Sequence, residues 1–247
     1  MIDPAVYSAL DSERFGIRVF RARVDTVAAA ADLMQFAPRA DLDLLIVRCP
    51  VAAVATAQRL ERAGCFLTDT LVIYRGTTGG FAPAPTLSPC IRACQAADRA
   101  ALEGVARASF AGFFGHYHAD PRLDPVAATE GYVQWASSAL DEASAVVLVS
   151  EAEGFLSGFL TAKKLDARTW EILLNGVAPE FQRRGIYAAL FREIGCRARL
   201  QGATEVLVST QLANVAPQKV WTRAGLALDH ALYTFHWWNP RVPGGPR

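Results

Sequence analysis

The chain has 247 residues, of which 52% are hydrophobic and 20% charged, and its formal net charge is +1. This length fits one large or two small domains, and the composition excludes general disorder. The balanced charge excludes a field that attracts nucleic acid or an anionic membrane. There is no basic leader followed by an apolar run and no apolar stretch of about 18 residues, so we expect a cytoplasmic protein.

The hydrophobic pattern predicts two series of strands and helices, separated by a segment with three glycines and three prolines at residues 76–89. The first series has strands at 17–24, 44–48 and 66–75 and helices at 26–35 and 51–62. The second has helices at 98–110, 125–140, 184–201 and 217–224, a short strand from residue 91, and strands at 146–149, 155–162, 170–177, 206–209 and 228–237. We therefore predict an amino-terminal α/β domain (1–76), a linker (77–89), a second domain (90–238) and a flexible tail (239–247).

The five cysteines are odd in number and irregularly spaced, which argues against a disulfide framework. Cys90 and Cys94 have no second pair or histidine spaced to complete a zinc site. We therefore expect reduced, buried thiols and no metal.

A shift of 161 positions superimposes similar residues of the two series without a gap. It places Leu45–Val47 on Val206–Val208, and Arg62–Gly64 on Arg223–Gly225. One interpretation is that any segment with the order strand, helix, glycine-closed turn and strand would show similar residues at these spacings. The other is that the first 75 residues are a degenerate copy of the unit that ends the chain.

The segment from Gln182 to Tyr187 lies between a predicted strand and a predicted amphipathic helix. The N–H groups of a helix start have no internal partners, and the helix dipole adds positive potential there. Gly185 permits close approach, and Arg183 and Arg184 add charge. The alternative is an ordinary helix start with solvated basic residues. The spacing of Pro179, Gln182 and Gly185 favours a phosphate-binding loop.

The pattern Val177-x-Pro179-x-x-Gln182-x-x-Gly185-Ile186 resembles the coenzyme A loop of the GNAT acetyltransferase superfamily, and the element order from Ile91 to Phe235 is similar to that fold. The resemblance implies an α+β fold with a central, mostly antiparallel sheet flanked by helices, preceded here by a smaller α/β domain like a degenerate half of the same fold. It implies acetyl-CoA, or another acyl-CoA, as co-substrate. The coenzyme-binding residues carried over are Leu174, Gly176, Val177, Gln182, Arg183, Arg184, Gly185, Ile186, Tyr187 and Asn214, with Tyr187 in place of the usual glycine or alanine.

A narrower resemblance covers nearly the whole chain. The run from Asp11 to Gly16, the run from Phe114 to Asp124, and Tyr132 with Trp135 are similar to the dTDP-fucosamine acetyltransferase subgroup. This resemblance implies a small-molecule acceptor, an amine on a nucleotide-linked deoxysugar, and leaves a homodimer open. It implies substrate contacts by His116, Tyr117, His118 and Asp120, for which simple exposure in a polar loop is the alternative.

Acyl transfer from a thioester to an amine needs a neutral amine, a stabilised oxyanion and a leaving thiolate. Backbone N–H groups near Gly176 and Val177 would stabilise the oxyanion. Glu171 and Asn175 on the same predicted strand would accept a proton or position the acceptor. For Glu171 the alternative is an ordinary solvent-facing strand residue.

The chain departs from the family at residue 221. In the family, an asparagine at the start of the penultimate helix is followed seven positions later by a tyrosine that protonates the thiolate; here Asn214 is followed by Trp221, whose N–H donates hydrogen bonds but is no acid. Water, Tyr187 or Tyr233 remain as proton donors. We therefore predict an N-acetyltransferase for an amino-sugar nucleotide, with two alternatives: a non-catalytic acyl-CoA-binding module or sensor, and a transferase for a peptide or small-metabolite amine.

Overall fold

The computed structural model describes residues 5–81 and 90–241, which form two compact units. Unit 1 comprises residues 5–72, 114–128 and 230–241, and unit 2 comprises residues 73–81, 90–113 and 129–229. The structure thus divides the chain differently from the continuous ranges predicted, because the last strand of the chain completes the sheet of unit 1. Residues 82–89 of the predicted linker and 242–247 of the predicted tail lie outside the described residues.

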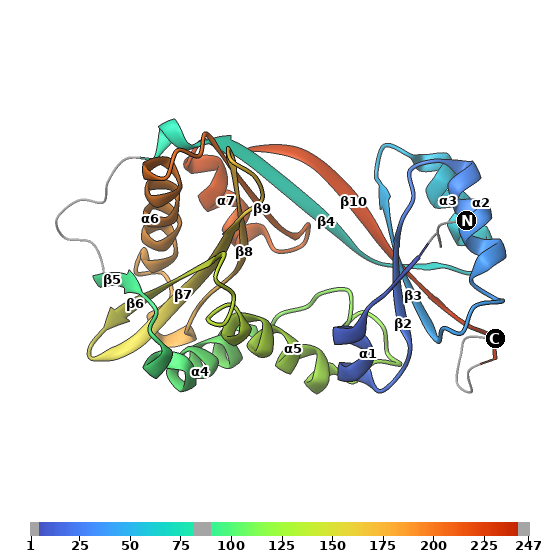
Figure 1. Cartoon of the computed structure of the whole chain (residues 1–247), viewed down its shortest axis with the longest axis horizontal. Helices are drawn as coiled ribbons and strands as arrows, with labels where there is room; N and C mark the ends of the chain where they lie inside the picture. The colour runs from blue at the N-terminus through green and yellow to red at the C-terminus, as the bar shows by residue number, and fades with distance from the viewer. Residues whose placement is uncertain (1–4, 82–89, 242–247) are drawn as a thin grey trace. The chain divides into compact units, whose positions relative to one another are not determined.

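Unit 1 is a mixed sheet with two helices packed on one face (Figure 1). Its elements are β1 (Val6–Tyr7), α1 (Ala9–Phe15), β2 (Val19–Arg23), α2 (Val27–Phe36), β3 (Leu44–Pro50), α3 (Val54–Arg62) and the greater parts of β4 (Phe66–Thr77) and β10 (Ala227–Trp238). β2 is parallel to β3, and β10 is antiparallel to β3. Alternate residues of a strand share a face, so Leu45 and Val47 of β3 join Phe235 and Trp237 of β10 in one core.

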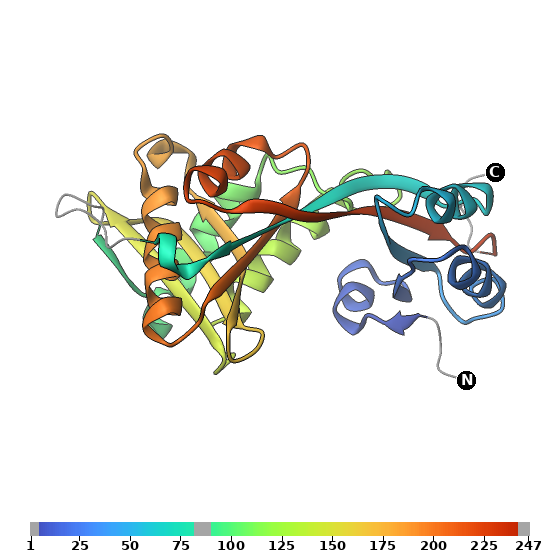
Figure 2. The same ribbon diagram turned by 90° about the horizontal axis from the view of Figure 1, so that it is seen from above.

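Unit 2 is a larger sheet with α4 on one face and α6 on the other, as Figures 1 and 2 show. Its elements are η1 (Thr78–Gly80), β5 (Cys90–Ala93), η2 (Ala96–Asp98), α4 (Arg99–Phe110), most of α5 (Pro125–Ser138), β6 (Ala145–Ala152), β7 (Phe155–Lys164), β8 (Thr169–Val177), η3 (Pro179–Phe181), α6 (Ile186–Leu200), β9 (Glu205–Gln211) and α7 (Val215–Arg223). The strand order is β9-β8-β7-β6-β5, antiparallel except for the parallel pair β8 and β9. The predicted α+β class with a mostly antiparallel sheet is confirmed.

The repeat predicted from the 161-residue shift is present in the structure. Adding 161 to the bounds of β3, α3 and β4 gives the bounds of β9, α7 and β10. Both repeats end their helix before a glycine with left-handed backbone, Gly64 (φ 86°) and Gly225 (φ 88°). The repeats exchange their last strands, because β10 pairs with β3 in unit 1, whereas β4 lies next to β9 in unit 2.

Some local predictions were wrong. The segment Ala9–Phe15 is a helix that the pattern did not reveal. Asn239, placed in the flexible tail, is buried, and its Nδ2 donates to the carbonyl of Leu42 at 3.0 Å. All five cysteines are free, but Cys90 is exposed and Cys94 half-buried rather than buried. Within residues 5–81 and 90–241, every helix is too short or too polar to cross a lipid bilayer.

The left-handed glycines of the two repeats should carry stability. We predict that Gly64→Ala and Gly225→Ala each lower the free energy of unfolding by about 1–2 kcal/mol, because a Cβ strains this conformation although neither site is crowded. Gly104→Ala, in the interior of α4 with open space around it, should instead stabilise by about 0.5–1 kcal/mol. Urea unfolding of the three variants checks this, and equal stability of all three would contradict it.

Candidate active site

The loop between β8 and α6 presents unpaired backbone donors. α6 begins at Ile186, two residues later than predicted, since Arg183 (φ 63°) and Gly185 (φ 79°) have left-handed backbones that a helix does not accommodate. Gly185 is the N-cap, and no side chain caps the first turn. The first bond of the helix runs from the Ala189 N–H to the Gly185 carbonyl, so the N–H groups of residues 186–188 have no partner within the helix. Such donors suit an anion, because the helix dipole also favours negative charge there.

The two arginines of the loop are not equivalent. Arg184 pairs with Glu153 at 2.6 Å and donates to the Glu180 carbonyl at 3.1 Å, so its charge is largely balanced. Arg183 is exposed and forms no ion pair with any described residue. Gln182 closes the loop by donating from Nε2 to the Val177 carbonyl at 3.1 Å. The free positive charge predicted for the loop therefore comes from Arg183.

β8 separates from β9 in its second half. Their parallel pairing ends at Ile172 and Val208, whereas the pairing of β8 with β7 continues to Val177. The register of β7 and β8 shifts at this point, where Thr161 pairs with Leu174 and Ala162 with Ile172, so Leu173 is an extra, bulged residue. The open edge of β8, meaning its backbone groups at residues 173–177 that face away from β7, therefore has no strand partner among residues 5–81 and 90–241.

The amides at this open edge can be identified by alternation. The Ala178 N–H donates to the Ser157 carbonyl of β7 at 3.0 Å, and the Leu174 N–H donates to Thr161 Oγ1 at 3.1 Å. In an antiparallel pair every second residue faces the partner strand, so the amides of Asn175 and Val177 face the open edge. The sequence suggested Gly176 as an oxyanion donor. Its amide faces β7 instead, because Gly176 lies two residues after Leu174 and alternate amides of a strand point the same way.

The equivalent position in unit 1 is closed. β2, α2 and β3 follow one another as β8, α6 and β9 do, but β2 pairs with β3 along its whole length. The start of α2 is capped by Thr26, whose hydroxyl accepts from the Ala29 N–H at 3.1 Å. Unit 1 therefore lacks both the open edge and the uncapped helix start.

Comparison with known proteins relates the segment that contains this site to a protein family. Residues 110–226 match the family model described as Acetyltransferase (GNAT) family. The matched segment, residues 110–226, is a GNAT domain. The resemblance to this superfamily is confirmed, and the loop and β8 lie within the matched segment.

Individual relatives share less of the chain. Over 143 residues it is 29% identical to the spore coat polysaccharide biosynthesis protein SpsD of Bacillus subtilis (strain 168), covering 57% of this chain and 48% of that protein. The chain thus spans about half the length of the curated relative it matches. A functionally unknown conserved protein from Staphylococcus epidermidis ATCC 12228 has a TM-score of 0.67 at 15% identity, over 97% of this chain and 92% of its own. A GCN5-related N-acetyltransferase from Kribbella flavida has a TM-score of 0.65 at 14% identity, over 99% and 89%.

The predicted coenzyme-binding residues of the GNAT domain lie along one continuous stretch. Residues 174–177 belong to the end of β8, residues 182–185 form the loop, and Ile186 and Tyr187 start α6. Asn214 is the N-cap of α7, and its Nδ2 donates to Thr210 Oγ1 at 3.0 Å, so its side chain joins β9 to α7.

Ser109 of α4 is a site residue that sequence reasoning missed. A Cβ added to Gly176 would lie 2.7 Å from Ser109 Oγ, so the hydroxyl packs directly against β8. This Oγ is buried and has no hydrogen-bond partner among the described residues. A buried hydroxyl without a partner is costly, which makes it a candidate to contact a ligand. The signal in the sequence was a serine beside the apolar face that includes Val105 and Ala106.

The bulge at Leu173 separates the two predicted catalytic residues. Glu171 pairs with Lys163 and Asn175 with Leu160, and positions 163 and 160 point to opposite faces of β7. Glu171 therefore shares a face with Leu174 and Gly176, whereas Asn175 lies on the face of Val177. Glu171 also precedes the open edge, since it still pairs with Leu207 of β9. The structure does not bring these two side chains together.

The two residues that depart from the family pattern do meet. Trp221 of α7 is 1% exposed, and its Nε1 donates to the hydroxyl of Tyr187 at 2.6 Å. Burial raises the pKa of the Tyr187 hydroxyl above its ordinary value, and the hydrogen bond from Trp221 opposes this shift in part. The hydroxyl is therefore protonated at neutral pH.

Three of the four predicted substrate contacts are buried inside unit 1. His116, Tyr117 and Asp120 are each at most 6% exposed, and His118 is half-buried with its Nδ1 accepting from the Gly115 N–H. His236 Nδ1 donates to Asp120 at 2.9 Å, and His116 Nδ1 lies 3.0 Å from His236 Nε2. A carboxylate only accepts, and a neutral histidine has one N–H. His236 therefore donates to Asp120 from Nδ1, and His116 donates to His236 Nε2.

A second set of hydrogen bonds in unit 1 joins the two subgroup motifs noted in the sequence. Tyr117 donates from its hydroxyl to Asp11 at 2.7 Å, and Arg21 bonds to both Tyr117 and Asp11. Burial raises the pKa of the Asp120 carboxyl, but hydrogen bonds from His236, Trp238 and Arg122 outweigh it and hold the pKa well below its ordinary value. In unit 1 these motif residues satisfy one another.

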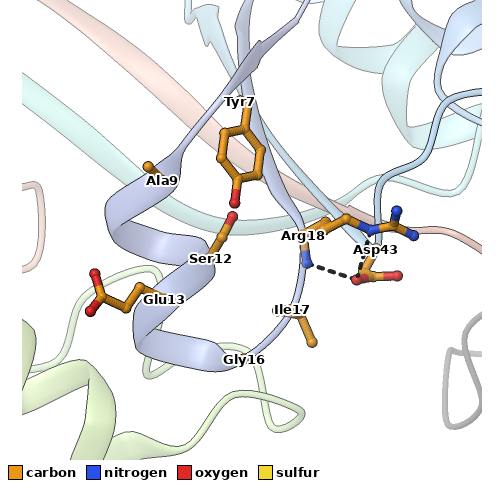
Figure 3. A pocket seen from close by; sticks show the side chains of 8 residues that line it. All are labelled: Tyr7, Ala9, Ser12, Glu13, Gly16, Ile17, Arg18 and Asp43. Carbon is orange, nitrogen blue, oxygen red and sulfur yellow. Dashed lines mark hydrogen bonds and ion pairs between the residues drawn. The ribbon is translucent and has the colours of Figure 1, made fainter.

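Unit 1 also has an open depression beside α1 (Figure 3). Its lining residues are Tyr7, Ala9, Ser12, Glu13, Gly16, Ile17, Arg18 and Asp43. Asp43 accepts from the Arg18 N–H at 2.7 Å, and the Arg18 guanidinium pairs with Asp41. The lining includes no residue of the loop or of β8, so we do not assign this depression to the GNAT domain's chemistry.

The histidine network makes unit 1 acid-sensitive. Burial lowers the pKa of His116 and of His236, although Asp120 opposes the second shift. Both therefore bind protons less readily in the folded state than in the unfolded state, so the unfolded state gains more protons as the pH drops below about 6.5, and stability falls. The other groups that act on the pair are His118, Arg21, Arg48 and Arg122.

We therefore expect the melting temperature to fall between about pH 7 and pH 5, with a flatter slope in His116→Gln/His236→Gln. A wild-type melting temperature that does not change over this range would contradict the argument. The loss from Asp120 protonation should come only below about pH 4.

The loop predicts how coenzyme A binds. Gly185→Asp should reduce affinity at least about a hundredfold, because two like charges about 4 Å apart cost roughly 4 kcal/mol near a protein surface. Gly202→Asp is the matched control, since Gly202 is also left-handed and uncrowded but lies just beyond the other end of α6. Isothermal titration should give one site per chain, weakened by salt. Unchanged affinity in Gly185→Asp, or two sites, would contradict the assignment.

Proposed function

We propose that the chain is an acyl-CoA-dependent N-acyltransferase that transfers acetyl from acetyl-CoA to a primary amine. One observation carries this proposal: the open edge of β8 leads directly into the uncapped start of α6. An edge that can accept an added strand, followed by an anion site, suits a ligand with an amide-containing arm and a diphosphate. Coenzyme A has both parts in this order.

Different groups of the site bind the coenzyme and stabilise the reacting thioester. The amides of residues 186–188 and the charge of Arg183 hold the diphosphate, and the open edge of β8 pairs with the pantetheine arm. The outward amides of Asn175 and Val177 donate to the thioester oxygen as it gains negative charge. Ser109 offers a further donor on the face of β8 where a Gly176 side chain would lie, and its buried hydroxyl has no partner among the described residues.

The amine must lose a proton before or during attack, and the structure constrains which groups take part. The Asn175 side chain has no titratable group, so it positions the acceptor rather than deprotonating it. Glu171 is the titratable candidate on β8, but it lies on the opposite face and before the open edge. We therefore assign Glu171 to proton transfer only through water.

We propose an amino-sugar nucleotide as the acceptor. The similarity to a spore coat polysaccharide biosynthesis protein supports an acceptor used in making polysaccharide. The runs 11–16 and 114–124, which resemble the dTDP-fucosamine acetyltransferase subgroup, support a nucleotide-linked deoxysugar. Peptide and small-metabolite amines remain competing acceptors because the fold does not fix the substrate.

The competing function is a sensor that binds acyl-CoA without turnover, and Trp221 is the observation that favours it. Indole supplies no acid at neutral pH. A thiol with a pKa of about 8.5 is nevertheless a fair leaving group, so the loss of a tyrosine at this position does not prevent reaction.

Release of free thiol from acetyl-CoA tests the proposal. We expect turnover with amino-sugar nucleotides well above the buffer rate, at higher kcat/KM than with free amino sugars or peptides carrying an N-terminal amine. Gly185→Asp should lose this activity, and Gly202→Asp should retain it. Coenzyme binding by the wild type without thiol release on any amine of the panel would favour the sensor and reject the transferase.

A further inference from the structure

The two unusual aromatic residues of the GNAT domain form one hydrogen-bonded pair. Tyr187 lies in the first turn of α6, directly after the loop, and Trp221 lies in α7, directly after β9 in the fold. The helices therefore follow the two strands that separate to leave the open edge. The 2.6 Å bond between Trp221 Nε1 and the Tyr187 hydroxyl joins them.

Resting on the proposed function, we infer that Tyr187 donates the proton to the thiolate that leaves acyl-CoA, with Trp221 as the residue that positions its hydroxyl. The polarity of the bond between them supports this role. An indole N–H only donates, so the Tyr187 oxygen is the acceptor and its own proton is directed elsewhere. No described residue accepts that proton. The hydroxyl thus keeps its own proton free to donate.

The surroundings of Trp221 hold this geometry in place. The indole is buried and packs against the Phe191 ring of α6, with ring centroids 6.4 Å apart. Phe191 is also 6.1 Å from the Tyr187 ring. A side chain enclosed in this way loses its rotamer freedom on folding, so the bond to Tyr187 requires no rearrangement during reaction.

The proposed step balances atoms and charge. When the tetrahedral intermediate collapses, the C–S bond breaks and its electron pair goes to sulfur. The Tyr187 O–H bond then breaks, its proton bonds to sulfur, and the phenolate is left. The Trp221 N–H stabilises this phenolate, which regains a proton from the one released by the attacking amine, through water. No oxidant, reductant or further reactant is needed.

Burial keeps Tyr187 in the donor form but weakens it as an acid, and the hydrogen bond from Trp221 opposes that loss of acidity. Its raised pKa leaves the hydroxyl protonated throughout the neutral range. A weak acid helps most when the charge on sulfur is greatest, so transfer should accompany C–S cleavage rather than precede it.

The first experiment compares three variants in the thiol-release assay. Tyr187→Phe removes only the hydroxyl and should lower kcat roughly 100-fold, the low end for acid catalysis, with unchanged coenzyme A affinity by titration. Trp221→Phe removes the N–H and should lower kcat less, and the double variant should resemble Tyr187→Phe. Tyr74→Phe is the matched control, since Tyr74 also packs on the Trp221 ring, at 5.3 Å, but its hydroxyl donates to Gln218. It should keep most of the activity.

A chemical series separates proton donation from packing. Fluorotyrosines placed at residue 187 differ in hydroxyl acidity but little in size, so kcat should follow their pKa if the proton is transferred. A kcat that is independent of this acidity, or wild-type kcat in Tyr187→Phe, would overturn the inference while leaving the transferase proposal intact.

A second measurement does not depend on turnover. Ultraviolet titration of the thiolate of bound coenzyme A should show that Tyr187→Phe raises the pKa of the bound thiol by about one unit, because a hydrogen bond to the charged sulfur is lost. Tyr74→Phe should leave this pKa unchanged. Equal thiol pKa values in the wild type and Tyr187→Phe would overturn the inference, whether or not an amine substrate has been found.

Discussion

The extra residue at Leu173 is the constraint on which the rest of the GNAT domain depends. Backbone groups inside a sheet must be paired, and the bulge shifts β8 so that its second half follows β7 and leaves β9. The amides of Asn175 and Val177 are then unpaired at the same end of the strand where α6 starts without a cap. Two kinds of unsatisfied donor, from a strand and from a helix, thus lie in sequence along one path.

Unit 1 shows what the same order of elements does when these donors are satisfied. β2 keeps its full pairing with β3, and the Thr26 hydroxyl caps α2. The polar residues of unit 1 are buried among themselves instead, with Asp120 and His236 in its interior. The same order of strand, helix and strand is therefore open at β8, α6 and β9 and closed at β2, α2 and β3. The difference comes from local hydrogen bonding rather than from the order of helices and strands.

The sequence revealed the features that depend on neighbouring residues. Strand and helix periodicity, the left-handed turns at Gly64 and Gly225, and the helix start after Gly185 are local, and each was predicted to within a few residues. The repeat was visible because similar residues recur at the same spacing in both copies, including Gly64 and Gly225. These predictions need only the spacing of apolar residues and the backbone freedom of glycine.

Features that depend on pairing between distant segments escaped it. A single bulged residue reverses the face of every later side chain, so Glu171 and Asn175 could not be assigned to faces from their spacing. His116 and Asp120 looked exposed in a polar segment, because their partners His236 and Trp238 lie more than a hundred residues later. In the sequence, Trp221 appeared only as the replacement of the family's acid tyrosine; the structure shows that it is hydrogen-bonded to Tyr187.

The exchange of last strands between the repeats has a consequence for how the chain folds during synthesis. β3 precedes β5 to β9 along the chain, whereas its antiparallel neighbour β10 follows them. The sheet of unit 1 therefore stays incomplete until β10 leaves the ribosome, and its edge at β3 is exposed to wrong pairing for that time. Because β4 is made early and waits for β9, neither unit can finish folding before the other has been synthesised. The two halves are thus bound to a single folding event, although each has a core of its own.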